Sequence, residues 1–224
     1  MKDKKRLVAK KVRISDIVNG KYFSGSKEEM RPSYVVTPFG DKISRVNLIA
    51  TVIDKFQSED EYSAITIDDG TEAIRVKTFR ESTNLLQNIE LGDLVLVIGK
   101  LKEYNGEVYV NGEIVKRIED PNLESLRRLE VLNNITEQKK IVEEIKNLKD
   151  KMSREELEEC MREKFGIERE VLEVIEENLR VAKVDYKPKI IELIDSLDEG
   201  SGVEINKIFE LSDLPESVIE SAIN

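Results

Sequence analysis

The sequence has no histidine, no tryptophan and only one cysteine, Cys160, among its 224 residues. A single cysteine excludes an internal disulfide, and without histidine the usual ligand sets for zinc and other transition metals cannot be assembled. Nucleophilic catalysis needs a base beside a serine or cysteine, and no histidine is present to act as one. We therefore expect a protein that is not an enzyme and that uses no cofactor.

Long hydrophobic runs are also missing. No run of 18 apolar residues occurs, and no apolar stretch follows the charged N-terminal residues MKDKKRLVAKKVR. Neither a membrane-spanning helix nor a signal peptide is expected, so we predict a cytoplasmic, nucleoid-associated protein without membrane contact. A glycine-rich phosphate loop is absent too, because Gly99, Gly106 and Gly112 are spaced for strands.

The charge is unevenly distributed along the chain. The 36 basic and 46 acidic residues give a net charge of −10. Ten basic and four acidic residues give residues 1–40 a charge of +6, whereas residues 41–120 carry −6 and residues 121–224 carry −10. Only the basic N-terminal arm, residues 1–30, offers an excess of positive charge, which serves either solubility or contact with phosphates.

Residues 43–118 alternate between apolar and polar side chains, as is typical of β-strands. We expect a long first strand over about residues 43–55 and two hairpins after it. One hairpin turns at Asp69-Gly70 and the other at Asn105-Gly106, because both dipeptides adopt the positive φ angles of a tight two-residue turn. The Asp68-Asp69 carboxylate pair is interpreted as part of the first turn rather than as a catalytic dyad.

A short helix or crossover is expected over residues 80–93, between the third and fourth strands. Gly99 and Gly112 are placed where a strand bulges or bends. Five strands with a helical insert in this position follow the order of the OB-fold, a small Greek-key barrel. A generic small β-barrel or sandwich is the alternative.

Two rows of cations and aromatics mark the predicted third and fourth strands. Residues two apart in a strand share a face, so the first row is Arg75, Lys77 and Phe79, and the second is Lys100, Lys102 and Tyr104. Cations contact phosphates while aromatic rings stack on bases, which is the combination that binds single strands with little sequence preference. For Phe79 alone, a place in the core is the competing interpretation.

The second half of the chain predicts helices. Four leucines recur at intervals of three, namely Leu123, Leu126, Leu129 and Leu132. A capping start at Ser153 and a stop at Gly166 indicate further helices. From Pro188 onward, a helix, a short strand at residues 202–205, a second helix and a third one opening near Pro215 resemble the start of a winged helix without its wing; a plain three-helix unit is the alternative.

Three segments together resemble a known family: VNLIATVIDKF, ITIDDGTEAIRVKTF and GDLVLVIGKLKEYNGEVYV. They are similar to the OB domain of the replication protein A small subunit, and SYVVTPFGDKISRV resembles the lead-in of archaeal replication protein A associated proteins. The resemblance covers roughly residues 31–120. It implies that Phe79 and Tyr104 stack on single-stranded DNA, although tryptophan is common at the first position and phenylalanine there would weaken stacking.

The resemblance also implies a domain order and partners. After the basic arm (1–30) it places an OB domain (31–120), a helical region (121–184) and a winged-helix-like, apparently incomplete domain (185–224), an α+β multidomain fold. We expect the leucines at 123, 126, 129 and 132 to contact a larger replication protein A subunit, with docking inside the chain as the alternative. The C-terminal domain would bind other replication or repair proteins.

Two other functions fit the same residues. The barrel and helices could serve only as an assembly scaffold, with the aromatic face covered by protein. Alternatively, the OB domain could bind RNA, because neither Phe79 nor Tyr104 distinguishes ribose from deoxyribose. We expect single-stranded DNA binding within a replication protein A-like complex, acting in replication, recombination and repair.

Overall fold

The computed structural model describes residues 7–26, 31–58, 62–181, 187–198, 202–212 and 219. The chain forms two compact units, Met1–Glu176 and Glu177–Asn224, each of which is described by itself.

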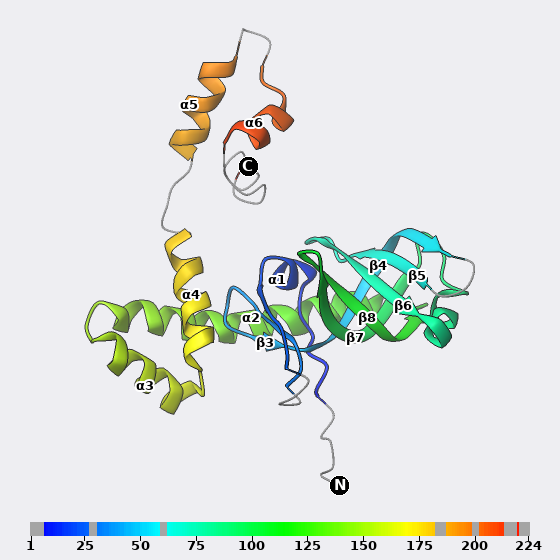
Figure 1. Ribbon diagram of the computed structural model, residues 1–224, viewed down its shortest axis with the longest axis horizontal. Coiled ribbons are helices and arrows are strands. Elements are labelled where there is room, and N and C mark those ends of the chain that lie inside the picture. Colours follow the sequence, from blue (N-terminus) through cyan, green and yellow to red (C-terminus); the bar gives the residue numbers. More distant parts are fainter. Residues whose placement is uncertain are drawn as a thin grey trace. The chain divides into compact units, whose positions relative to one another are not determined.

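A closed five-stranded barrel forms the centre of the first unit (Figure 1). The strand order is β4-β5-β6-β8-β7, all neighbours are antiparallel except the parallel pair β6 and β8, and β7 pairs with β4 to close the barrel. A 3₁₀ helix, η1 (Arg80–Leu86), follows the third barrel strand. The predicted OB-fold is thereby confirmed; its strands are β4 (Arg45–Gln57), β5 (Tyr62–Asp68), β6 (Ala73–Phe79), β7 (Leu94–Tyr104) and β8 (Glu107–Arg117).

The barrel interior is filled by every second residue of its strands, because alternate side chains of a strand point to opposite faces. On β4, for example, Val46, Leu48, Ala50 and Val52 are buried, and Leu86 of η1 joins the same core. The predicted bulge occurs at Gly99, where the register between β7 and β8 shifts. A Cβ atom at Gly99 would lie 2.4 Å from the carbonyl oxygen of Asn111, so only glycine fits there.

The two predicted hairpin turns differ in the structure. Asn105 and Gly106 have φ angles of 54° and 82°, which confirms the two-residue turn between β7 and β8. The two-residue turn expected at Asp69-Gly70 was wrong, because residues 69–72 form a longer loop between β5 and β6. Asp68 accepts a hydrogen bond from the Gly70 amide at 2.6 Å, and these Asx-type contacts stabilise the wider loop.

Residues 7–23 pack against the barrel instead of projecting from it. The Lys10 amide donates to the Arg45 carbonyl oxygen at 2.9 Å, and Val12, Ile14 and Ile17 belong to the barrel core. The segment continues into a separate three-stranded antiparallel sheet. The segment contains the short helix α1 (Ile14–Val18), and the strands of the sheet are β1 (Lys21–Phe23), β2 (Tyr34–Val36) and β3 (Lys42–Ile43).

The long helix α2 (Asn122–Lys149) follows the barrel directly (Figure 1). Its buried side chains are Arg127, Val131, Ile135, Val142 and Ile145, a set at helical spacing that forms one face. Arg127 donates a hydrogen bond from its guanidinium to the Asn47 carbonyl oxygen of β4, which fixes the helix on the barrel. No helix in the described ranges has both the length and the apolar character needed to cross a bilayer.

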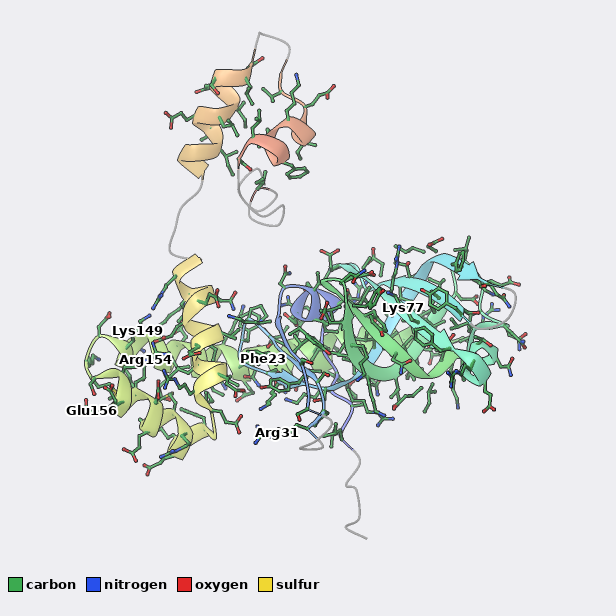
Figure 2. The ribbon with its side chains drawn as sticks, in the orientation of Figure 1. Phe23, Arg31, Lys77, Lys149, Arg154 and Glu156 are labelled. Atoms are coloured by element: carbon green, nitrogen blue, oxygen red, sulfur yellow. The ribbon has the colours of Figure 1, made fainter. Side chains whose placement is uncertain are left out.

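Two shorter helices complete the first unit, α3 (Arg154–Phe165) and α4 (Arg169–Val181), whose last residues extend beyond it. The predicted capping box is present: Ser153 accepts from the Glu156 amide, and the Glu156 carboxylate accepts from the Ser153 amide, at the end of α3 marked by Glu156 in Figure 2. Gly166, with φ of 65°, ends α3 as expected. Lys42 of β3 forms a 2.8 Å ion pair with Glu168, which ties these helices to the small sheet.

In the second unit, the structure describes α5 (Lys187–Leu197) and α6 (Ile205–Leu211). Ile190, Ile208 and Ile219 form its buried core. The short strand predicted at residues 202–205 is not formed, since residues 202–204 are irregular and Ile205 begins α6. The predicted third helix lies almost entirely outside the described residues, so the winged helix stays a prediction.

Candidate nucleic-acid interface

The two predicted rows lie on one outer surface of the barrel, but they are not neighbours. Strand β8 separates β6, which carries the first row, from β7, which carries the second. Lys77 and Lys100 are both register partners of Asn111 on β8, while Lys102 faces Tyr109 and Tyr104 faces Glu107. The candidate site is therefore a three-strand surface formed by the outward residues of β6, β8 and β7, and Lys77 marks it in Figure 2.

The middle strand contributes two carboxylates that hold most of the predicted phosphate-binding cations. Glu107 lies 3.7 Å from Arg75 and 3.5 Å from Lys77. Glu113 lies 2.9 Å from Lys100 and 2.6 Å from Arg45 of β4. Partial burial acts to raise the pKa of Glu113, but the hydrogen bonds from Lys100 and Arg45 outweigh it and hold that pKa below its ordinary value.

Lys102 differs from the other predicted cations. It is exposed, and within the described part of the chain it forms no ion pair. Its register partner is the ring-bearing Tyr109. A phosphate can therefore reach Lys102 without displacing a carboxylate.

Lys77 and Tyr109 form the centre of the surface. Lys77 is only 9% exposed, contrary to the expected exposed position, and its ammonium stands 4.3 Å from the centroid of the Tyr109 ring. Burial, with a smaller influence from Tyr22 and Tyr62, raises the pKa of the Tyr109 phenol above its ordinary value. The sequence analysis did not identify Tyr109 as a site residue. The alternating pattern predicted its strand but gave no sign that this strand lies between the two rows.

Phe79 lies at one end of the surface, within a group of aromatic rings. Its ring is 43% exposed and stands 5.5 Å from that of Tyr62, which in turn stands 5.8 Å from Phe56. Arg80, which follows it, has a φ of 55°, and this uncommon backbone conformation turns the chain from β6 into η1. The exposure of Phe79 argues against a place in the core, which holds Thr78 instead.

Tyr104 lies at the opposite end, beside the turn between β7 and β8. Its side chain is 66% exposed, and no ring contact involves it among the described residues. Next to this turn an open groove of about 440 Å³ is lined by Val18, Arg75, Gly106 and Glu107 among others. The ion-paired side chains of Arg75 and Glu107 thus belong to both the groove and the three-strand surface.

The carboxylates of Asp68 and Asp69 accept hydrogen bonds from backbone amides. Besides the Asp68 contact with Gly70, Asp69 accepts from the amides of Thr71 at 3.0 Å and Ile14 at 2.9 Å. The second contact holds the first residue of α1 against the barrel. These contacts agree with the structural interpretation of the pair.

The predicted subunit-contact residues lie on the face of α2 away from its buried side. Val131, on the buried side, is 5% exposed and packs inward. The barrel does not cover the four predicted leucines, whose exposed fractions are Leu123 42%, Leu126 52%, Leu129 66% and Leu132 56%. We call these four residues the leucine ridge.

The basic arm offers fewer free cations than its composition indicates. Lys10 pairs with Asp41 at 2.6 Å, Lys11 with Glu130, and Arg13 with Asp16 at 2.6 Å. The remaining arm cations before Leu7 lie outside the described residues. The described part of the arm thus uses its charge to hold the fold.

The barrel resembles known nucleic-acid-binding domains. Residues 46–121 match the tRNA anti-codon family, described as an OB-fold nucleic acid binding domain. None of the curated proteins matches the chain.

Among solved structures, the chain is similar to a component of the S. pombe Stn1–Ten1 complex, with 18% identity and a TM-score of 0.50 over 60% of this chain and 96% of that one. A replication protein A heterotrimer bound to single-stranded DNA gives 18% identity and a TM-score of 0.49 over 59% of this chain and 98% of that one. Yeast replication protein A bound to single-stranded DNA gives 25% identity and a TM-score of 0.44 over 56% of this chain and 88% of that one. The Stn1–Ten1 similarity, at this identity, establishes the OB-fold.

Proposed function

We propose that the chain is a non-enzymatic, single-stranded DNA-binding subunit of a replication protein A-like complex. The observation that carries the proposal is the three-strand surface, where exposed rings at Phe79 and Tyr104 flank cations on the outside of an OB barrel. Rings supply stacking for any base, and cations supply contacts to the backbone phosphates. The family match to an OB-fold nucleic acid binding domain supports the same class of ligand.

The register sets how a strand would lie on this surface. From Glu107, the partner of Tyr104, to Asn111, the partner of Lys77, is four residues, and Phe79 lies two residues farther along β6. At about 3.3 Å per residue, the two rings are roughly 20 Å apart along the strands. Phe79 and Tyr104 would therefore stack on bases that are not adjacent, with Tyr109 between them.

The leucine ridge supports the subunit part of the proposal. Four exposed leucines at three-residue intervals form an apolar stripe that winds around the outer side of the helix; another folded domain normally covers such a surface, and the barrel does not cover it. We propose a larger replication protein A-like subunit as the partner. The second unit would contact other replication or repair proteins, as the resemblance of its helices to a winged helix implies.

A scaffold without nucleic-acid contact is the competing function, and it shares the leucine ridge. The two functions differ only in whether the three-strand surface binds nucleic acid. Titration of the full chain with fluorescent oligo-dT and oligo-U over a range of salt concentrations tests them. We expect saturable binding of oligo-dT that weakens with salt. A folded chain that binds neither oligonucleotide at low salt would favour the scaffold, and tighter binding of oligo-U would favour an RNA ligand.

A further inference from the structure

The candidate site contains carboxylates between its two rows of cations, which a surface built only for phosphate would not need. Glu107 and Glu113 both project from β8, between the two rows. Each holds two cations: Arg75 and Lys77 for Glu107, Lys100 and Arg45 for Glu113. Of the four cations in the two predicted rows, Lys102 alone has no ion pair with a described residue.

A phosphate that binds Arg75, Lys77 or Lys100 must compete with a carboxylate for the same ammonium or guanidinium group. The two negative charges also repel any phosphate close to β8. Together they weaken the electrostatic part of binding and leave the stacking part unchanged, because stacking does not depend on cation charge. The consequence depends on which ligands can stack.

A duplex and a single strand differ in this respect. Duplex bases are paired and stacked inside the helix, so a duplex offers the surface only its phosphates, at one charge per about 1.7 Å of axis. A single strand can place its bases on the exposed rings of Phe79 and Tyr104. A duplex also brings the phosphates of two strands to the surface, so the same two carboxylates repel it more strongly than they repel a single strand, whose charge density is lower.

We propose that Glu107 and Glu113 are specificity-determining residues that make this surface prefer single-stranded over double-stranded nucleic acid. This inference rests on the proposed function and adds the source of its selectivity. The aromatic rings favour single strands, and the two carboxylates on β8 act against duplexes.

The experiment compares the unaltered full chain with Glu107→Gln, Glu113→Gln and the double variant, because glutamine keeps the size of the side chain and removes its charge. Binding to oligo-dT and to a duplex of equal length is measured over a range of salt concentrations. If each substitution frees one phosphate contact, the advantage of the double variant over the unaltered chain in duplex affinity should be about tenfold larger at about 50 mM than at about 200 mM salt. The salt slope for duplex should steepen by about 1.8.

For the single strand we expect a smaller gain, because each phosphate contact contributes about 0.7 to its salt slope instead of about 0.9. The ratio of single-strand to duplex affinity should therefore fall, by roughly twofold more at about 50 mM than at about 200 mM salt. The matched control is Glu137→Gln with Glu159→Gln, which removes two exposed, ion-paired glutamates on α2 and α3 and changes the net charge equally. Its affinity ratio should stay unchanged.

The outcomes separate this inference from the proposed function. Binding of oligo-dT by the unaltered chain tests the proposed function. If that binding is present but the double variant keeps the same ratio, or the control lowers it equally, the carboxylate inference is overturned and the proposed function stands. If neither the unaltered chain nor the double variant binds oligo-dT, both fail. Glu107→Gln alone covers the case in which loss of the Glu113 ion pairs unfolds the double variant.

Discussion

Replacement of Phe79 by alanine tests the stacking role of the first row most directly. The ring is 43% exposed, and the ring contact shown for it is with Tyr62 at 5.5 Å. Losing one aromatic pair costs about 0.5–1.5 kcal/mol, whereas truncating a fully buried phenylalanine costs about 3–5 kcal/mol. The midpoint of thermal unfolding should therefore fall by only about 1–6 °C.

The effect on binding should be larger than the effect on stability. Loss of one stacked base costs about 1–3 kcal/mol, so the dissociation constant for oligo-dT should rise roughly 5- to 150-fold with little dependence on sequence. Phe79→Trp should retain or strengthen binding, because indole offers a larger face to a base. Fluorescence anisotropy measures the affinity, and circular dichroism on the same samples measures the unfolding midpoint.

Phe56→Ala is the matched control. Phe56 is also exposed and also contacts Tyr62, at 5.8 Å, but it lies on β4, outside the three-strand surface. It should lower the unfolding midpoint by a similar amount and leave binding nearly unchanged. Normal binding by a folded Phe79→Ala protein would refute the stacking role, and so would an equal loss in Phe56→Ala.

Two further predictions concern other parts of the first unit. The double substitution Leu126→Asp with Leu129→Asp should change the free energy of unfolding by no more than about 0.5 kcal/mol per site, since both side chains are exposed. It should nevertheless abolish co-purification with a large subunit. Unchanged co-purification would contradict the role of the leucine ridge. The pKa of Glu113 is lowered by Lys100 and Arg45, so its stabilising contribution is complete above the unfolded value near 4.5 and is lost as pH falls through the lower folded value. The unaltered chain should therefore exceed Glu113→Gln in unfolding midpoint at neutral pH and lose that advantage in acid; an advantage that stays constant below pH 4 would argue against the ion pairs.

Local sequence patterns were sufficient for the elements of the barrel and for many of its boundaries. Alternation over residues 43–118 predicted five strands, and Asn105-Gly106 predicted its turn, because positive φ angles are a property of those two residues. Ser153 and Gly166 likewise marked the limits of α3 through local hydrogen bonds and backbone conformation. The outward direction of Arg75 and Phe79 followed from the two-residue period alone.

Local rules failed where a side chain or backbone group from elsewhere intervened. Asp69 is adjacent to a glycine, as a tight turn requires, but its carboxylate also accepts from the Ile14 amide, and the loop is wider than two residues. Residues 7–23 have the composition of an arm, yet three apolar side chains among them enter the barrel core. Neither the hydrogen bond to Ile14 nor the packing of residues 7–23 into the core can be recognised from the local sequence of the segments involved.

The sequence by itself determined that two rows of cations and aromatics face outward from an OB barrel, because strand periodicity is encoded in neighbouring residues. Only the tertiary structure decided what lies between the rows. The parallel pairing of β6 with β8 joins segments that are far apart in the chain, and it places Glu107, Tyr109 and Glu113 between them. The charge of the surface, and the selectivity that we propose for it, depend on that long-range pairing, which no local pattern specifies.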